Sequence, residues 1–278
     1  MKFNLDTAWK DATGLLSRNF GLLAVVAGVF FFLPNAGMTI AIPEMQELTK
    51  AQSSGNFEIM MAAVQDLYME YWWAFLILAI VQGIGVLAML ALVRRRANPT
   101  VGEALGSGVR LVASYIAAQL LQTVVIAGVA LSIVAVLALT GLQVLAALGA
   151  VAASVVALYL LVKFSLISPI IGIEGERSPV AAIRRSWTLT KGNSMRLFLF
   201  YVLLIVAFVV VSAVISLVLG LLFALAGSQA ALMGEAVISG IANAAGIVLM
   251  VCVLAAIHTQ LLRAEVQPSV PVSHHGED

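Results

Sequence analysis

Six long apolar stretches limit what this chain can fold into. A helix of about 20 apolar residues crosses the hydrocarbon core of a bilayer, which is roughly 30 Å thick. Hydrophobic residues make up 62% of the chain and charged residues only 10%, which is more apolar surface than a soluble domain can bury. The sequence therefore predicts an all-α, polytopic membrane bundle. Its six predicted transmembrane helices cover about residues 20–42, 73–93, 112–139, 143–168, 197–226 and 236–262.

Two of these stretches run into each other and need a turn between them. Together they are too long for one crossing, and Thr140-Gly141 is the obvious turn. We therefore expect a tight helical hairpin at this point. Two prolines mark further irregularities. Pro34 interrupts the first span, and the fourth span is expected to bend or end near Ser168-Pro169.

The basic residues are concentrated in alternate connections between the spans. Of the 15 Lys and Arg residues, all except Lys50 lie on or close to one side of the predicted topology. The positive-inside rule predicts that this side faces the cytoplasm, and an even number of spans places both termini there. Residues 1–266 then form a single transmembrane domain. Residues 267–278, which include His274 and His275, form a polar cytoplasmic tail.

Three segments on the basic side resemble one another. Each is short and amphipathic and precedes two spans; they are residues 4–20, 98–115 and 178–198. Two of them contain a polar residue followed by proline, Asn98-Pro99 and Ser178-Pro179, which is typical of a helix N-cap and the first helical position. The pattern predicts cytoplasmic interfacial helices, arranged as three repeats of one interfacial helix and one transmembrane hairpin.

The third segment contains a basic, Trp-bearing stretch at residues 181–193. Val180, Ile183 and Trp187 share one helical face, and Gly192 is typical of a left-handed helix end. We expect a helix lying on the membrane surface with Trp187 at headgroup depth. Three interpretations stay open: topology and anchoring alone, a site for an anionic lipid or phosphate-bearing ligand, or a docking face for a partner protein. The residues expected to contact an anionic headgroup or ligand are Arg184, Arg185, Trp187, Lys191, Arg196, Arg110 and Arg18.

The connection between the first two spans contains a second amphipathic pattern. Its apolar residues follow helical spacing and predict an outer helix at about residues 56–71. Ser53-Ser54-Gly55 is expected to break the chain before this helix, and Trp72 and Trp73 mark the outer membrane interface after it. The helix either rests on the bilayer, covers a cavity as a lid, or contacts an extracytoplasmic partner.

Metal-binding and catalytic patterns are absent from the sequence. It contains no HExxH, CxxC, GxSxG or P-loop pattern, so we expect no enzyme activity, metal, cofactor or nucleic-acid partner. His258 is expected to make an interfacial hydrogen bond, and Cys252 to fill space in the core. Lys163 is expected near the inner interface, where its stem reaches towards water. Polar residues in the spans either hydrogen-bond between helices or line a cavity; the candidates are Gln82, Gln119, Gln122, Asn243 and Lys163.

The stretch SPVAAIRRSWTLTKGN, residues 178–193, resembles the cytoplasmic signature of the bacterial glycerophosphodiester phosphodiesterase membrane-domain family and its YciC-like relatives. The residues that carry the resemblance are Pro179, Ala182, Ser186, Trp187, Thr190, Lys191, Gly192 and Asn193. It implies a six-helix module of a bacterial inner (cytoplasmic) membrane. Some members carry a catalytic barrel, but the spans and short loops leave no room for one here. The resemblance therefore implies no enzymatic activity.

From these features we expect a non-enzymatic bacterial inner-membrane protein that binds or organises lipid-like or amphipathic molecules through basic cytoplasmic interfacial helices. The alternative is a transporter, an exporter component, or a resistance or immunity protein for a small amphipathic substrate or peptide. Membrane lipids are the expected partners, together with a membrane or extracytoplasmic protein in the alternative case. Faces of small residues also permit a homo-oligomer.

Overall fold

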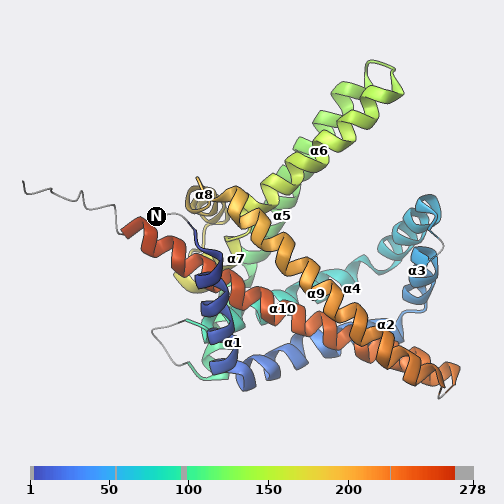
Figure 1. The fold of residues 1–278 in the computed structure, drawn as a ribbon, viewed down its shortest axis with the longest axis horizontal. Helices are drawn as coiled ribbons and strands as arrows, with labels where there is room; N and C mark the ends of the chain where they lie inside the picture. Colours follow the sequence, from blue (N-terminus) through green and yellow to red (C-terminus); the bar gives the residue numbers. More distant parts are fainter. Residues whose placement is uncertain (1–2, 54, 95–98, 226, 267–278) are drawn as a thin grey trace, which may run out of the picture.

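The computed structural model describes residues 3–53, 55–94, 99–225 and 227–266, and every regular element within these ranges is helical (Figure 1). The first half contains α1 (Leu5–Ala27), the π-helical turn η1 (Gly28–Phe32), α2 (Leu33–Ala41), α3 (Glu44–Ser53), α4 (Phe57–Leu92) and α5 (Val101–Ala138). The second half contains α6 (Gln143–Phe164), α7 (Ile167–Pro169), the π-helical turn η2 (Ile170–Glu174), α8 (Pro179–Leu189), α9 (Ser194–Leu225) and α10 (Ser228–Val266). The predicted polar tail at residues 267–278 lies outside the described residues.

Six helical segments of the described chain are long and apolar enough to cross a membrane. They are Leu5–Ala41, Phe57–Leu92, Val101–Ala138, Gln143–Glu174, Ser194–Leu225 and Met233–Glu265. Each predicted span overlaps one of these segments almost completely. The all-α class and the multi-pass membrane architecture are therefore confirmed.

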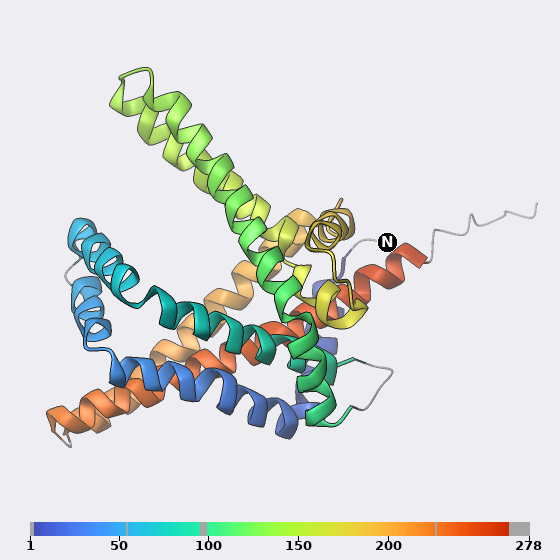
Figure 2. The same ribbon diagram turned by 180° about the vertical axis from the view of Figure 1, so that it is seen from behind.

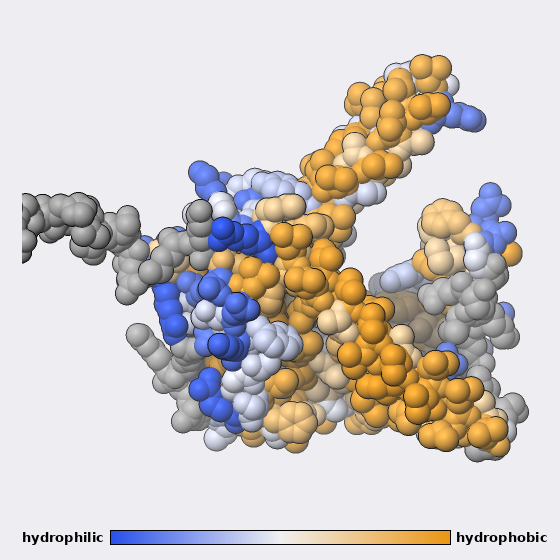
Figure 3. Space-filling view, viewed as in Figure 1, coloured by the Kyte–Doolittle hydropathy of each residue, from blue (hydrophilic) through white to orange (hydrophobic). Residues whose placement is uncertain are grey.

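The helices meet at one end of the molecule and diverge from it. In Figures 1 and 2, α5 and α6 form a hairpin that projects away from the rest of the chain, while α9 and α10 lead off in another direction. At the junction α1 packs against α10, and α4 packs against α5. Leu87, Leu90, Leu166, Ile170 and Ile257 are all 0% exposed. The hydrophilic residues gather near this junction, around α8 and α1, whereas the hairpin and α9 present apolar surface (Figure 3).

The predicted threefold set of interfacial helices is wrong for its first two members. Residues 4–20 do not form a separate helix, because α1 continues without a break into the first span. Residues 101–115 likewise belong to α5, which continues into the third span. Only the third segment contains a separate helix, α8. The amphipathic segments that precede spans one and three are thus N-terminal extensions of the same helices.

Helix α8 begins and ends as predicted. The Ser178 side chain accepts a hydrogen bond from the backbone N–H of Ala181 at 3.3 Å, and Pro179 is the first helical residue. After the helix, Gly192 adopts a φ of 81°, a left-handed conformation that favours glycine. The chain can therefore turn sharply between α8 and α9.

The start of α5 differs from the prediction. The Thr100 side chain accepts a hydrogen bond from the Glu103 N–H at 3.3 Å, and the Glu103 carboxylate accepts one from the Thr100 N–H at 2.8 Å. This capping box satisfies two backbone donors that have no partner within the helix. The helix therefore starts at Val101, after Pro99, and the predicted N-cap Asn98 lies outside the described residues.

The predicted irregularities in the spans are present in modified form. In span one the chain passes through a π-helical turn before Pro34, where the Leu33 N–H bonds to the Gly28 carbonyl, so the helix continues instead of breaking. In span four α6 ends shortly before Pro169, because the proline ring would clash with the carbonyl four residues earlier. The hairpin turn is confirmed, with Gly141 at a φ of 71°.

The outer connection contains one helix that the pattern did not predict. Helix α3 precedes the expected break, which Gly55 makes at a φ of 67°. Asn56 then caps α4 by accepting a hydrogen bond from the Glu58 N–H at 2.9 Å. The predicted amphipathic helix is the first part of α4, and a kink at Tyr71 (φ −112°, ψ 20°) separates it from the second span. Whether it acts as a lid or contacts a partner stays a prediction.

The close contact between α4 and α5 depends on Gly108. A methyl group there would lie 2.8 Å from the Ile84 carbonyl oxygen, whereas one at Gly106 of the same helix would meet no atom within 4 Å. We expect Gly108→Ala to be less stable than the matched control Gly106→Ala by about 1–2 kcal/mol, as is typical of overpacking. Denaturant-induced unfolding in detergent micelles, followed by circular dichroism, measures the difference. Equal stability of the two variants would contradict the close contact.

Candidate functional site

Helix α8 is attached to the point where the fourth span breaks. The Ser186 hydroxyl donates to the Lys163 carbonyl at 2.7 Å and accepts from the Leu166 N–H at 3.2 Å. The Thr190 hydroxyl donates to the Ser186 carbonyl at 2.9 Å. Both hydroxyl residues are 0% exposed. They supply partners for backbone groups that the end of α6 leaves free, and an unpaired buried backbone group is costly.

Trp187 covers a lysine that lies inside the protein. The Nζ atom of Lys163 lies 5.1 Å from the centroid of the Trp187 ring and 5.6 Å from that of Tyr159, within the range of a cation–π interaction. Trp187 also contacts the Phe164 ring, with 5.9 Å between the centroids. Lys163 is 3% exposed, so the expectation that its side chain reaches out to the interface is wrong.

The apolar stripe predicted for α8 is not its buried face. Val180 is 48% exposed and Trp187 is 40% exposed. The buried residues of the helix are Ala182, Ser186 and Leu189, which lie on another face. The reason is that the hydroxyl of Ser186 has to reach the broken span, and this requirement decides the rotation of the helix. Trp187 consequently packs beside Lys163 while part of its ring stays exposed, and its predicted position at headgroup depth stays a prediction.

A groove between α6 and the start of α9 has two lysines in its lining. It has a volume of about 670 Å³ and is lined by Val155, Leu158, Tyr159, Val162, Lys163, Lys191, Gly192, Ser194, Met195 and Phe198. We call it the lysine groove. Its walls are mostly apolar, and the positive charges of Lys163 and Lys191 act on each other. An anion bound near both ammonium groups would relieve their repulsion and make charge-assisted hydrogen bonds.

Arg185 anchors α8 to the last helix. Its guanidinium donates to both carboxylate oxygens of Glu265, at 2.9 and 2.8 Å. Its Nε atom also lies 3.8 Å from a Glu174 oxygen. The hydrogen bonds to Glu265 raise the pKa of the Arg185 guanidinium above its usual value. This side chain is therefore already paired with carboxylates, in contrast to the headgroup contact that we expected of it.

The other predicted cations do not converge on the lysine groove. Arg196 donates to the Phe3 carbonyl at 3.3 Å and holds the N-terminal segment. Arg18, Arg110 and Arg184 are exposed. Of the predicted contact set, only Lys191 lines the groove, while Trp187 stacks on its other lysine.

A buried histidine completes the network around α8. His258 is 1% exposed, and its Nε2 atom lies 2.7 Å from Glu174 Oε1. Glu174 thus links α10 to η2 and, through Arg185, to α8. The predicted hydrogen bond of His258 is present, and the residue is buried within the protein. The partners Glu174 and Glu265 were not predicted, because they lie far from His258 and Arg185, respectively, in the sequence.

Asn193 connects the same region to the beginning of the chain. Its side-chain oxygen accepts a hydrogen bond from the Phe3 N–H at 2.9 Å. Gln260 of α10 donates to the Asn4 carbonyl at 3.3 Å. The residues of the stretch 178–193 therefore hold four parts of the protein together: the N-terminal segment, the broken fourth span, α9 and α10.

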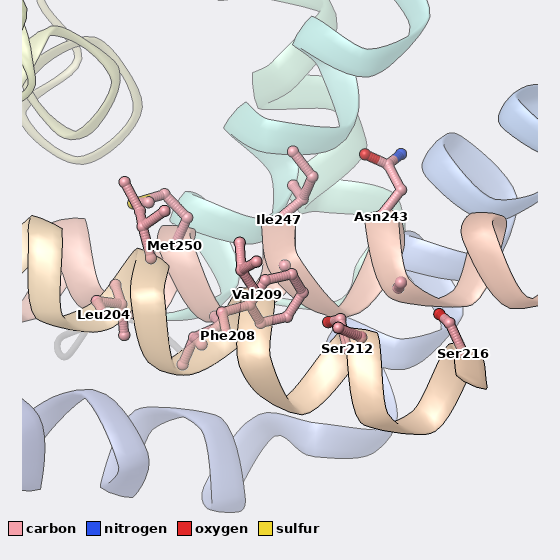
Figure 4. A pocket seen from close by; sticks show the side chains of 13 residues that line it. Leu204, Phe208, Val209, Ser212, Ser216, Asn243, Ile247 and Met250 are labelled. Atoms are coloured by element: carbon pink, nitrogen blue, oxygen red, sulfur yellow. The ribbon is translucent and has the colours of Figure 1, made fainter. Parts of the chain in front are cut away.

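Two further grooves lie between other helices. One, of about 560 Å³, runs between α9 and α10 and includes Asn243 in its lining (Figure 4). The other, of about 480 Å³, runs between α2 and α4 and is lined by residues that include Pro34 and Trp73. Of the predicted cavity residues, Lys163 and Asn243 do line grooves, but different ones.

The glutamines predicted to line a cavity are not brought together with Asn243. Gln82, Gln119 and Gln122, all within the described chain, line none of these three grooves. Gln119 donates to the Tyr115 hydroxyl at 3.2 Å, which is a bond within α5 and not between helices. None of these three grooves unites the polar residues that the transporter alternative places around one central cavity.

Within the described ranges no group of three or more His, Cys, Asp or Glu residues is placed to hold a metal ion. His274 and His275 lie outside those ranges. Cys252 is 0% exposed and fills space in the core, as predicted.

These features define the class of the protein: a multi-pass helical membrane protein whose basic segment organises its helix junction and whose lateral grooves open between helices. The chain belongs to the family described as a domain of unknown function (DUF7847), whose model matches residues 4–264. No curated protein and no solved structure matches the chain. The resemblance to the glycerophosphodiester phosphodiesterase membrane-domain family stays a prediction.

Proposed function

We propose that this protein binds an amphiphile with an anionic headgroup in the lysine groove. The observation that carries the proposal is that two lysines, Lys163 and Lys191, share the lining of one otherwise apolar groove. The apolar walls suit an acyl chain, and the ammonium groups suit a phosphate or carboxylate. A volume of about 670 Å³ lies within the usual range for small-molecule sites, which is enough for a headgroup and part of an acyl chain.

The burial of Lys163 supports a ligand at this position. A lysine within a membrane span is costly and usually marks a functional site. Its positive charge faces the rings of Tyr159 and Trp187 and is also close enough to Lys191 to feel repulsion. A bound anion would offset both the desolvation of Lys163 and this repulsion.

We place the protein in a bacterial inner membrane with both termini in the cytoplasm, following the distribution of its basic residues. The lysine groove then opens at the cytoplasmic leaflet, which is rich in anionic lipids. The protein would bind or organise such lipids without an enzymatic step. Transport of the same amphiphile is the alternative, and it differs in predicting movement of lipid between the leaflets.

Replacing the groove lysines should weaken binding of anionic lipid. We expect Lys163→Met and Lys191→Met each to lower the affinity for phosphatidic acid by about ten-fold, because each removes one charge-assisted contact. Binding to phosphatidylcholine should not change. Native mass spectrometry of the purified protein, with each lipid titrated in detergent, measures the two affinities.

Two control variants decide what a loss of binding means. Lys10→Met removes an exposed cation in α1 that does not line the groove and should leave binding unchanged. Arg184→Ala tests the surface of α8, where headgroups could bind without the groove. If Arg184→Ala weakens phosphatidic acid binding and the two lysine variants do not, recognition occurs at the surface and the proposal is wrong.

A further inference from the structure

The groove between α9 and α10 differs in chemistry from the lysine groove. Its lining contains three polar residues, Ser212 and Ser216 from α9 and Asn243 from α10. The remaining lining residues are apolar or glycine, and none carries a charge; they are Leu204, Ile205, Phe208, Val209, Ala213, Ala242, Gly246, Ile247, Leu249 and Met250. In Figure 4 the side chains of Asn243 and Ile247 project to one side of α10, and Ser212 and Ser216 lie on the neighbouring α9.

The three polar side chains have no hydrogen-bond partner within the described part of the chain. Other hydroxyl groups in the spans do have one: Ser132 and Ser154 donate to the carbonyl one turn earlier, at 2.7 and 2.8 Å. Water is scarce in the hydrocarbon core, so a polar group there has to find its partner in the protein or in a ligand. Asn243, Ser212 and Ser216 are therefore available to a molecule in the groove.

The lining of this groove offers no counter-ion to a charged headgroup. Ser212 is 18 residues after Ser194, where α9 begins, which corresponds to about 27 Å along the helix axis. Ser194 itself lines the lysine groove. The polar part of a ligand in the second groove would therefore lie far along the span from the lysine groove, beside no charged lining residue, and an ionised group within a span is disfavoured without a partner.

The hydrogen-bonding capacity indicates the class of ligand. A carboxamide donates two hydrogen bonds and accepts others, and a serine hydroxyl both donates and accepts. These groups match ester carbonyls and a free hydroxyl, and the apolar walls match acyl chains. We infer that the α9–α10 groove binds an uncharged lipid of the diacylglycerol type. This inference is independent of anionic lipid binding in the lysine groove.

A matched pair of probes tests the inference. The probes are a photoactivatable diacylglycerol and the corresponding phosphatidic acid, with the same diazirine-bearing acyl chains, added to the full chain in nanodiscs. After irradiation, mass spectrometry locates the labelled peptides. We expect the diacylglycerol to label peptides from residues 204–216 and 242–250, and the phosphatidic acid to label peptides that line the lysine groove.

Three variants separate specific binding from partitioning into the bilayer. Asn243→Leu should reduce diacylglycerol labelling of the groove by about five-fold, as expected for a lost hydrogen bond in a membrane. Ala242→Leu should also reduce it, because the larger side chain fills the groove while the polar groups stay. Ser239→Ala is the control, since Ser239 already donates to the Ala236 carbonyl at 3.2 Å and does not line the groove.

The inference is overturned if the diacylglycerol does not label the groove, or if Asn243→Leu and Ser239→Ala are labelled equally. A cross-link between two chains through Ser212→Cys would overturn it as well, by placing a second copy in the groove. Loss of phosphatidic acid labelling alone would count against the lysine groove and leave this inference standing.

Discussion

We expect Ser186→Ala to lower the free energy of unfolding by about 2–4 kcal/mol, the largest effect of any single substitution considered for this protein. The Ser186 hydroxyl bonds to both the Lys163 carbonyl and the Leu166 N–H, and it is completely buried. Its removal takes away the partner of the Leu166 N–H and leaves the Lys163 carbonyl with only the longer bond from the Thr190 hydroxyl, at 3.5 Å. No water can replace the hydroxyl unless the helices separate.

The matched control for this prediction lies on the exposed side of the same helix. Thr188→Ala removes a hydroxyl that bonds only to the Arg184 carbonyl within α8, and it should change stability by less than about 0.5 kcal/mol. Unfolding in detergent micelles, followed by tryptophan fluorescence, compares the two variants. If Ser186→Ala is as stable as Thr188→Ala, the attachment of α8 to span four does not contribute to stability in the way that we argue.

The stability effect should extend to ligand binding. Trp187 lies next to Ser186 in the sequence and covers Lys163, and Lys191 follows the same helix. Loosening α8 would displace Trp187, which covers Lys163, and also Lys191, which lines the lysine groove. We therefore expect Ser186→Ala to weaken phosphatidic acid binding under conditions in which the protein is still folded.

We expect the second largest effect from Glu174→Ala, a loss of about 1–3 kcal/mol. Glu174 is the hydrogen-bond partner of the buried His258 and also lies 3.8 Å from Arg185. Alanine would leave a buried imidazole without a partner. Glu174→Gln keeps an oxygen that can accept from His258, so this variant should retain most of the stability.

A double-mutant cycle with His258→Leu gives the sharper test. If the cost of Glu174→Ala comes from the unpaired imidazole, the same substitution should cost much less when residue 258 is leucine. Thermal unfolding of the four proteins in detergent yields the coupling energy. A coupling energy near zero would show that the 2.7 Å contact contributes nothing to stability.

Much of the membrane architecture could be predicted from hydropathy alone. The spans were predictable because each must present about 20 apolar residues to the bilayer whatever its neighbours are. The hairpin turn at Gly141 and the turn at Gly192 were predictable for a local reason, since both need a left-handed conformation that glycine adopts easily. The break in the fourth span was predictable from Pro169 for an equally local reason, because a proline ring clashes with the carbonyl four residues earlier in a helix.

The boundaries of the interfacial segments were not predictable in the same way. Amphipathicity indicates that a segment has two faces, but it does not distinguish a separate surface helix from an extension of a span. The capping box of Thr100 and Glu103 sets the first residue of α5. The helix then runs without interruption from this amphipathic segment into the third span. Helix α3 was missed because its sequence is polar on average and contains no apolar run that would mark it as an element.

By itself, the sequence determined the class of the protein, the number of its spans and the importance of the stretch 178–193, because these depend on composition and local pattern. Only the tertiary structure decided what that stretch does. Ser186 and Arg185 hold the helix junction together, whereas Lys191 joins Lys163 in the lining of a groove. These roles depend on partners that lie some 20 to 80 residues away in the chain. The physical reason is that hydrogen bonds and ion pairs need precise three-dimensional contact, which a one-dimensional pattern of polar and apolar residues does not specify.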